Sequence, residues 1–155
     1  RIKPSVIDEL GSTLDIFPTI LEMSNSGQVD DRIIDGLSIK NTLLNLEPSK
    51  REKVIFYRER EVYALRYRQF KAHFITNGVY NYPSRDIKTY LKNPLLYNLD
   101  IDPSEKYDIA DENPEILKKI YEVLESHQNN LNAPEDLLQY RDNNGNTDGI
   151  DNSLD

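Results

Sequence analysis

Four carboxylates crowd into one short stretch of the chain, DIDPSEKYD, and are the first side chains that could do chemistry. They are Asp100, Asp102, Glu105 and Asp108. Two carboxylates that flank a sugar can serve as acid and base, or as acid and nucleophile, in glycoside hydrolysis. Asp and Ser on either side of a proline are also the ordinary residues of tight turns. We therefore expect a turn-rich connection here, in which the acids have structural roles.

The chain holds few other catalytic groups. It has no cysteine, and His73 and His127 are its two histidines. Catalysis of the Ser–His–Asp or Cys–His kind needs a histidine oriented within a cluster, and neither histidine has a sequence neighbourhood that suggests one. We interpret both as half-buried packing residues. Without cysteine there is neither a disulfide nor a cysteine-based metal site.

A calcium-loop pattern lies near the C-terminal end. Asn144, Asn146 and Asp148 alternate before Gly149, and Asp155 takes the twelfth place, as in an EF-hand loop. The first ligand is Asn, however, the last is Asp where Glu is usual, and no second helix follows. We expect a flexible polar tail here in preference to a calcium-binding loop.

The composition narrows the class of protein. The 155 residues suffice for one domain with a hydrophobic core. With 19 Lys and Arg against 27 Asp and Glu, the net charge is −8, and no dense basic patch predicts a nucleic-acid partner. Apolar runs are too short for a membrane span. The opening residues, RIKPSVIDELGS, resemble no signal peptide and lack an initiator Met.

The segment GSTLDIFPTILEMS predicts a short helix near the N-terminus. Ser12 or Asp15 can cap it, and Pro18 falls in its first turn, where a missing N–H costs nothing. Its broad apolar face comprises Ile16, Phe17, Ile20, Leu21 and Met23. Further on, Asp35-Gly36 predicts a turn with a glycine that tolerates positive φ, before a short amphipathic stretch ended by Pro48.

Four strand-like segments follow, joined mostly by short connections. They are KVIFY (53–57), EVYALRYR (61–68), QFKAHFIT (69–76) and PLLYNLD (94–100). A polar loop, 77–93, separates the last two. Short connections favour an antiparallel sheet.

A longer helix is predicted after the acidic turns. Asn113 would cap it, Pro114 would take the first position, and Glu115 would meet the positive end of the dipole. One apolar stripe at helical spacing comprises Ile116, Leu117, Ile120, Leu124 and His127. Packed on one face of the sheet, this helix completes an α+β fold.

The order of these motifs resembles the C-terminal region of sulfatases of the arylsulfatase A and N-acetylgalactosamine-6-sulfatase type. The matching strings run from about residue 9 to about residue 135: STLDIFPTILEMS, IIDGLSI, REKVIFYR, YALRYRQFKAHFITNG, NPLLYNLDIDPSEKYDIADENPEIL and HQNNLNAPE. No single string is decisive, but their shared order makes the resemblance specific. Most of the shared residues are structural.

The resemblance implies a division into parts. Such enzymes have a large N-terminal α/β domain and a small domain, a four-stranded antiparallel sheet packed against a long C-terminal helix. Residues 1–50 would then be the end of the large domain with its short helix, 51–135 the small domain, and 136–155 a flexible polar tail.

The resemblance also implies hydrolysis of a sulfate ester. A formylglycine attacks sulfur, a calcium ion held by Asp and Asn side chains binds the sulfate, and Lys, Arg and His assist. In the family, the nucleophile, the calcium ligands and the assisting Lys and His residues precede the LDIFPT helix. We therefore assign no catalytic residue, no metal ligand and no cofactor to this chain, and expect it to be inactive alone.

The string NYPSR (81–85) resembles the sulfatase motif C-x-P-S-R, whose first residue becomes the formylglycine. Asn81 cannot become an aldehyde by that route, and the string falls between the third and fourth strands instead of near the start of the large domain. The following DIKTYLKN also lacks the family pattern. We interpret the match as coincidence.

The loop around this string could still contact substrate, because the corresponding region in the family can lie at the pocket rim. Tyr80, Tyr82 and Tyr90 offer flat platforms for a sugar ring, and Arg85 and Lys88 could meet an anionic group. The site residues that we predict are Tyr80, Tyr82, Arg85 and Lys88.

The sequence thus indicates the C-terminal portion of a sulfatase, with a sulfated carbohydrate as substrate and the N-terminal sulfatase domain as partner. The resemblance implies a periplasmic or extracellular protein. We favour a bacterial source, because a secreted animal enzyme would usually carry disulfides and this chain has no cysteine. The alternative is a stand-alone, non-catalytic binding module with the same small-domain fold. A degenerate sulfatase is a third possibility. An exposed apolar face on LDIFPTILEMS would favour the first hypothesis over the module.

Overall fold

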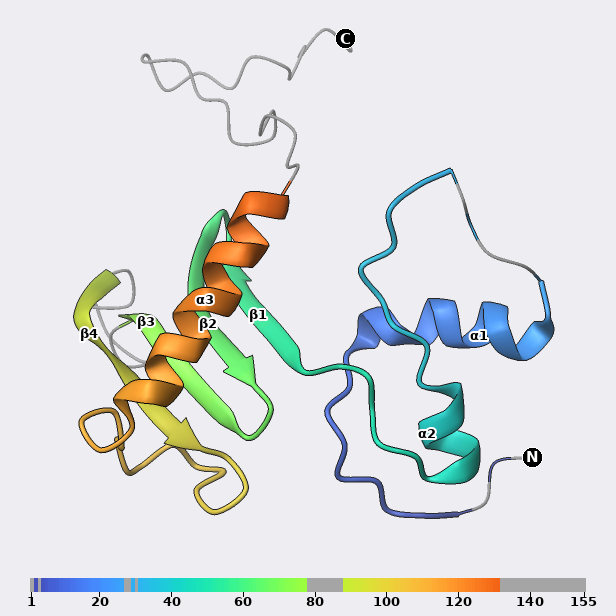
Figure 1. Ribbon diagram of the computed structural model, residues 1–155, viewed down its shortest axis with the longest axis horizontal. Helices are drawn as coiled ribbons and strands as arrows, with labels where there is room; N and C mark the ends of the chain where they lie inside the picture. Colours follow the sequence, from blue (N-terminus) through green and yellow to red (C-terminus); the bar gives the residue numbers. More distant parts are fainter. Residues whose placement is uncertain (1, 3, 27–28, 30, 78–87, 132–155) are drawn as a thin grey trace, which may run out of the picture.

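The computed structural model of the chain describes residues 2, 4–26, 29, 31–77 and 88–131. Its elements follow in the order η1 (Thr13–Asp15), α1 (Ile16–Ser24), α2 (Lys40–Asn45), β1 (Lys53–Arg58), β2 (Glu61–Tyr67), β3 (Phe70–Asn77), β4 (Lys88–Asn98) and α3 (Pro114–Asn130). Figure 1 shows α3 lying across one face of the sheet, with α1 and α2 beside the sheet, next to β1.

The four strands form one antiparallel sheet in the order β1-β2-β3-β4, which confirms the predicted α+β fold. Tight turns join the first three strands, and Glu59 and Arg68 in these turns adopt positive φ values of 56° and 52°. A break in register lies between Phe56 and Tyr57. The predicted strand boundaries in this part are correct to within one residue.

The fourth strand is longer than the sequence predicted. It begins at Lys88 instead of Pro94, and its first residues pair with the end of β3 as far as Asn77. A second break in register, between His73 and Ile75, separates this early part of the ladder from the rest. The predicted end of the loop at residue 93, just before Pro94, was therefore wrong. At an edge strand, a proline that cannot donate to the ladder is tolerated.

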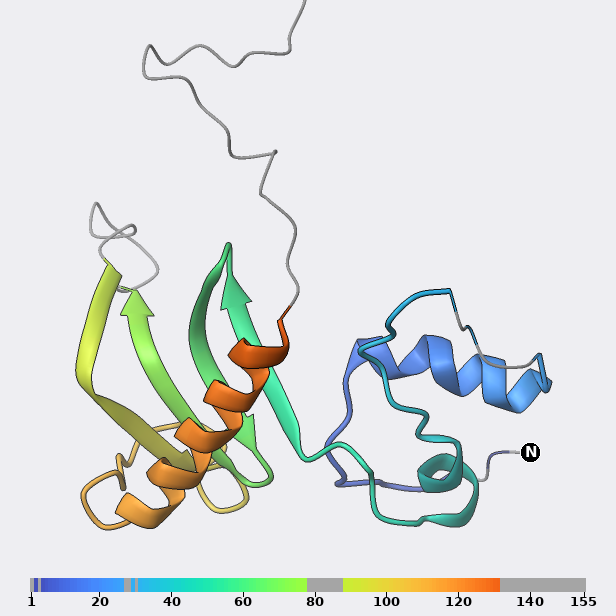
Figure 2. The same ribbon diagram turned by 45° about the horizontal axis from the view of Figure 1, so that its top comes forward.

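The hydrophobic core lies between the sheet and α3. Leu65, Ala72, Leu96 and Ile120 are fully buried, and Ala110 closes one end. The predicted helical stripe packs on this core through Ile116, Leu117, Ile120 and Leu124, and Val123 joins it. Figure 2 shows α3 over the same face of the sheet in a second view. Burial of Ile120 alone contributes roughly 1.5–3 kcal/mol.

The start of α3 is partly as predicted. Pro114 takes the first position and Glu115 lies in the first turn. Asn113, however, makes no side-chain cap: its Nδ2 donates to the carbonyl oxygen of Ile109 at 2.9 Å. Asn113 thus occupies the predicted N-cap position, while its side chain secures the preceding turn instead of bonding a helix N–H.

At the N-terminal helix, both predicted cap residues are used together. Ser12 Oγ accepts a hydrogen bond from the Leu14 N–H at 3.3 Å, and Asp15 Oδ2 accepts one from the Ser12 N–H at 2.8 Å, a capping box. The box caps η1, and α1 continues from Ile16. Pro18 falls in the first turn of α1, as predicted.

Gly36 is required for a different reason from the one predicted. The chain makes no turn at this residue, and its φ is not in the left-handed region. Its backbone instead passes so close to η1 and α1 that a Cβ would collide with the Leu14 carbonyl and lie 2.9 Å from Pro18 Cγ. Glycine therefore permits this close approach.

We expect Gly36→Ala to lower the free energy of unfolding by about 1–3 kcal/mol, since the methyl group must displace backbone. Gly11→Ala is the matched control, because a Cβ at Gly11 has no neighbour within 4 Å. Urea unfolding of both variants measures the difference. Equal stabilities would contradict the close-approach explanation.

Candidate functional site

The most buried charged group is Asp15, whose side chain is fully enclosed. Arg51 holds it through two hydrogen bonds, one from Nε to Oδ2 at 2.7 Å and one from Nη2 to Oδ1. The N–H groups of Ser12 and Leu37 also donate to it, each at 2.8 Å. Every oxygen of this carboxylate is thus satisfied within the fold.

The electrostatics of Asp15 agree with a structural role. Burial by itself raises the pKa of Asp15, but the hydrogen bonds from Arg51, Leu37 and Ser12 outweigh it, so the pKa lies below its ordinary value. Arg51 also donates to the Asp35 carbonyl at 3.0 Å. A carboxylate that is ionised and enclosed in this way cannot act as a general acid or base.

The predicted carboxylate cluster does not form a catalytic pair. Asp102 Oδ2 accepts from the N–H groups of Lys106 and Tyr107 at 2.7 and 2.8 Å. Asp108 Oδ1 accepts from those of Leu96 and Ala110 at 2.9 and 3.0 Å. Both acids fix the turns after β4, which confirms the structural interpretation.

Both histidines are half-buried and contact side chains of the small domain. His73 Nε2 lies 2.5 Å from Glu105 Oε2, and Glu105 also accepts from Lys71 Nζ at 2.6 Å. His127 Nε2 lies 2.8 Å from the Tyr57 hydroxyl. Burial and nearby Lys53 lower the pKa of His127, with a smaller opposing effect from Asp35. Neither histidine orients a serine, so the prediction of packing residues is confirmed.

The resemblance implies a calcium ion in the part of a sulfatase that precedes the LDIFPT helix, and the described residues offer no site for it. Within them, no group of three or more His, Cys, Asp or Glu side chains could hold a metal. The buried carboxylates Asp15 and Asp102 already accept N–H donors. The calcium-loop pattern of residues 144–155 lies outside the described residues.

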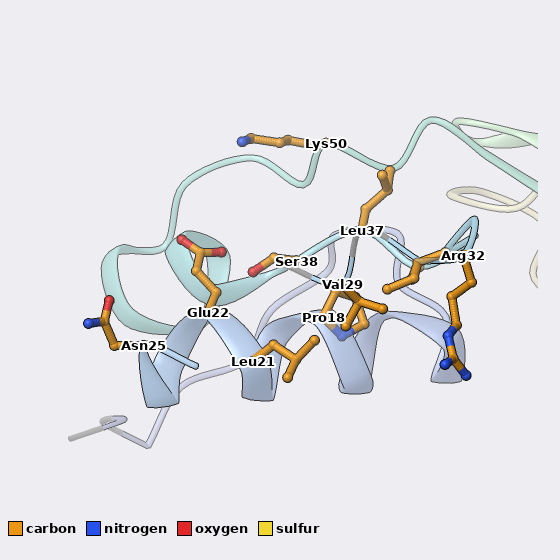
Figure 3. Close-up of a pocket in the computed structure, with 11 residues that line it drawn as sticks. Pro18, Leu21, Glu22, Asn25, Val29, Arg32, Leu37, Ser38 and Lys50 are labelled. Atoms are coloured by element: carbon orange, nitrogen blue, oxygen red, sulfur yellow. The ribbon is translucent and has the colours of Figure 1, made fainter. Parts of the chain in front are cut away.

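A first cavity, of about 510 Å³, lies between α1 and residues 32–38 of the segment that follows it. Figure 3 shows Pro18, Leu21 and Val29 gathered in this space. Among its lining residues, Arg32 is paired with Asp31, and Glu22 lies 3.6 Å from Lys40. Among its described lining residues there is no histidine, and the Ser38 side chain hydrogen-bonds to Glu22.

A second cavity, of about 480 Å³, lies at the end of the sheet beside the last turn of α3. We call it the sheet-end groove. It is lined by Tyr57, Arg60, Glu61, Val62, Phe74, Ile75, Tyr90, Leu91, Leu124, Gln128 and Leu131. Its lining combines aromatic, polar and apolar side chains.

Of the four predicted site residues, Lys88 is the one that the structure describes. Its Nζ lies 2.5 Å from Glu61 Oε2 and 3.6 Å from Glu59 Oε2, and the hydrogen bond to Glu61 raises the pKa of Lys88. Tyr90 donates its hydroxyl to the same Glu61. The other three, Tyr80, Tyr82 and Arg85, lie outside the described residues together with the NYPSR string. Their contact with substrate stays a prediction.

The sequence also predicted an apolar face on the first helix, and the structure leaves most of it exposed. The α1 face, as we call it, comprises Leu14, Ile16, Phe17, Ile20 and Met23. Each of these side chains is between 45% and 58% exposed, and nothing in the described part of the chain covers them. Leu21, which we had placed on this face, lies in the first cavity instead.

The described residues thus form a small antiparallel sheet that carries one helix, and acids fix the turns after β4. The chain belongs to the family of the C-terminal region of aryl-sulfatase, which matches residues 49–150.

Curated relatives agree with this family. Arylsulfatase A of Bos taurus is 31% identical over 137 residues, covering 80% of this chain and 27% of its own length. N-acetylgalactosamine-6-sulfatase of Homo sapiens is 30% identical over 146 residues, covering 81% of this chain and 28% of its own length. The chain thus spans little more than a quarter of the curated relatives that it matches.

Solved structures share the fold. The PsFucS1 sulfatase from Pseudoalteromonas sp. superposes with a TM-score of 0.68 at 24% identity, covering 81% of this chain and 26% of that one. A Bacteroides thetaiotaomicron protein, described under the metabolism of multiple glycosaminoglycans, superposes with a TM-score of 0.66 at 26% identity, covering 83% and 27%.

The Asp15–Arg51 pair gives a test of the buried site. Arg51→Met leaves a buried carboxylate without its cation, and we expect a loss of about 3–5 kcal/mol in the free energy of unfolding. Arg32→Met breaks the exposed pair with Asp31, whose side chains are 69% and 64% exposed, and should cost at most about 1 kcal/mol. Urea unfolding compares them. A small loss for Arg51→Met would show that the buried pair is dispensable.

Proposed function

We propose that this chain is the C-terminal portion of a sulfatase that hydrolyses the sulfate esters of a carbohydrate. The family match and the relatives' names support the sulfatase assignment. One observation of the structure carries it further: the exposed α1 face, which needs a partner that the described chain does not supply.

The partner that we propose for the α1 face is the N-terminal sulfatase domain of the same polypeptide. Ile16, Ile20 and Met23 recur at helical spacing, which is the pattern of a helix that buries one side. An exposed apolar surface of this kind marks an interaction site. Nearly three-quarters of the length of the matched relatives lies outside the alignment, which leaves ample chain for such a domain.

Within that enzyme, this chain would act as scaffold and pocket rim. The nucleophilic formylglycine and the calcium ion would belong to the N-terminal domain, where they would supply sulfur attack and charge stabilisation. The Asp15–Arg51 pair would tie the helix that meets that domain to β1. Tyr80, Tyr82, Arg85 and Lys88 would contact the substrate, and Lys88 would first have to exchange its bond to Glu61.

A periplasmic or extracellular location, in a bacterium, is part of this proposal. It is tested by a signal sequence in the same reading frame and by fractionation of the producing cells. No helix in the described ranges is long and apolar enough to cross a membrane. The rival hypothesis, a stand-alone binding module, would require a polar outer side on α1, and the α1 face is apolar.

Turnover of an aryl sulfate tests the enzyme assignment. We expect the protein encoded by the complete reading frame to release 4-methylumbelliferone from its sulfate, whereas the 155-residue chain alone stays at the blank. Replacing the Cys or Ser of the expected C-x-P-S-R or S-x-P-S-R motif by Ala should abolish the activity. Turnover by the isolated chain, or a complete frame without that motif, would overturn the assignment.

Self-association tests the α1 face independently of catalysis. We expect the isolated chain to associate in solution, and Ile16→Glu with Ile20→Glu to shift it toward monomer, because two charges in an apolar contact are costly. Ile33→Glu is the control, since Ile33 is 88% exposed and lies outside this face. Light scattering coupled to size exclusion measures the mass. A clean wild-type monomer would favour the binding module.

A further inference from the structure

The sheet-end groove is lined by residues of all four strands and of α3, and it has the size of a ligand site. The strands and the helix are held together by the core. A volume of about 480 Å³ falls in the usual range for small-molecule sites. The question is which chemistry its lining would recognise.

Two tyrosine rings line the groove, and both are fixed. Tyr57 and Tyr90 are 41% and 65% exposed. The Tyr57 hydroxyl lies 2.8 Å from His127 Nε2, and the Tyr90 hydroxyl donates to Glu61. An exposed tyrosine whose hydroxyl is already held presents a rigid, amphipathic surface at low entropic cost. Such rings can stack on the C–H face of a sugar.

Polar side chains stand beside these rings. Glu61 and Gln128 line the groove, the first as an acceptor and the second with both an acceptor and donors. The lining also includes the apolar side chains of Phe74, Leu91 and Leu124. A few polar groups among apolar ones match a molecule with hydroxyl groups at its edge and C–H groups on its face.

The charges of the lining argue against a sulfated ligand. The lining includes one acid, Glu61, and one base, Arg60. Lys88 lies next to the groove and has its charge directed to Glu61. Recognition of sulfate usually relies on several cationic or N–H donors, as in bidentate contacts from arginine. The described residues of the lining include no such cluster, so an uncharged ligand suits them better.

We propose that the sheet-end groove binds an uncharged sugar residue, with Tyr90 and Tyr57 as stacking surfaces and Gln128 and Glu61 as hydroxyl partners. This rests on the proposed function in one respect: an enzyme that acts on a carbohydrate chain would meet unsulfated residues of that chain. The groove itself takes no part in sulfate hydrolysis and would hold the chain at a second point.

Ligand-observed NMR tests the site with neutral probes. Saturation transfer from the 155-residue chain to β-1,4-galactotetraose, methyl β-galactoside and methyl N-acetyl-β-galactosaminide is measured in titrations at millimolar concentration. This readout tolerates self-association through the α1 face. We expect at least one probe to bind, and Tyr90→Ala to weaken its binding roughly tenfold or more, because a stacking surface is lost.

Two variants separate stacking from other effects. Tyr90→Phe keeps the ring and loses the bond to Glu61, and we expect its affinity to stay within about threefold of the wild type. Tyr107→Ala removes another exposed tyrosine, 72% exposed on the loop after β4 and absent from the groove lining, and should change nothing. Amide exchange on each variant confirms that the fold is kept.

The outcomes divide as follows. No binding of any neutral probe, or equal losses with Tyr90→Ala and Tyr107→Ala, would overturn the site. Binding of a neutral probe by a protein whose complete frame shows no aryl-sulfate turnover would uphold the site and reject the proposed enzyme. Aryl-sulfate turnover by the complete protein without probe binding would uphold the proposed enzyme and reject the sugar site.

Discussion

One buried ion pair connects the two parts of the described chain. Asp15 ends η1 and Arg51 lies just before β1, 36 residues later, yet they meet in a site where the carboxylate is fully buried and the Arg51 side chain is 10% exposed. Because a buried charge without its partner is strongly destabilising, the pair fixes where the first helix lies relative to the sheet. The same carboxylate also holds the segment that contains Gly36 and Leu37, because it accepts a hydrogen bond from the Leu37 N–H.

The chemistry of the chain follows from this arrangement. Asp15, Asp102 and Asp108 accept hydrogen bonds from backbone N–H groups, and Asp15 also pairs with a cation. These bonds orient each carboxylate and stabilise the backbone around it. What the described part presents outward is apolar on α1 and aromatic at the sheet end. Both surfaces are suited to binding, one to a protein domain and one to a flat neutral ligand.

Several features could be predicted from the sequence because they depend on neighbours along the chain. The capping box of Ser12 and Asp15 needs residues three apart, and the stripe of α3 needs only the helical period. The alternation of apolar and polar residues, and the short connections between the segments, predicted the antiparallel strands. The boundary of β4 could not be predicted, because residues 88–93 become strand only by pairing with the end of β3 across a break in register. Asn113 takes the N-cap position as predicted, but the bond from its side chain to the Ile109 carbonyl could not be predicted.

The sequence by itself determined the elements, the apolar face of the first helix, the structural use of the turn acids and the resemblance to sulfatases. These rest on local periodicity, turn chemistry and motif order. Only the tertiary structure decided that Asp15 pairs with Arg51, that Gly36 serves a close approach, and that Tyr57 and Tyr90 line one groove. Each of these depends on contacts between residues far apart in the chain, and such contacts exist only once the sheet has formed and its neighbours have packed.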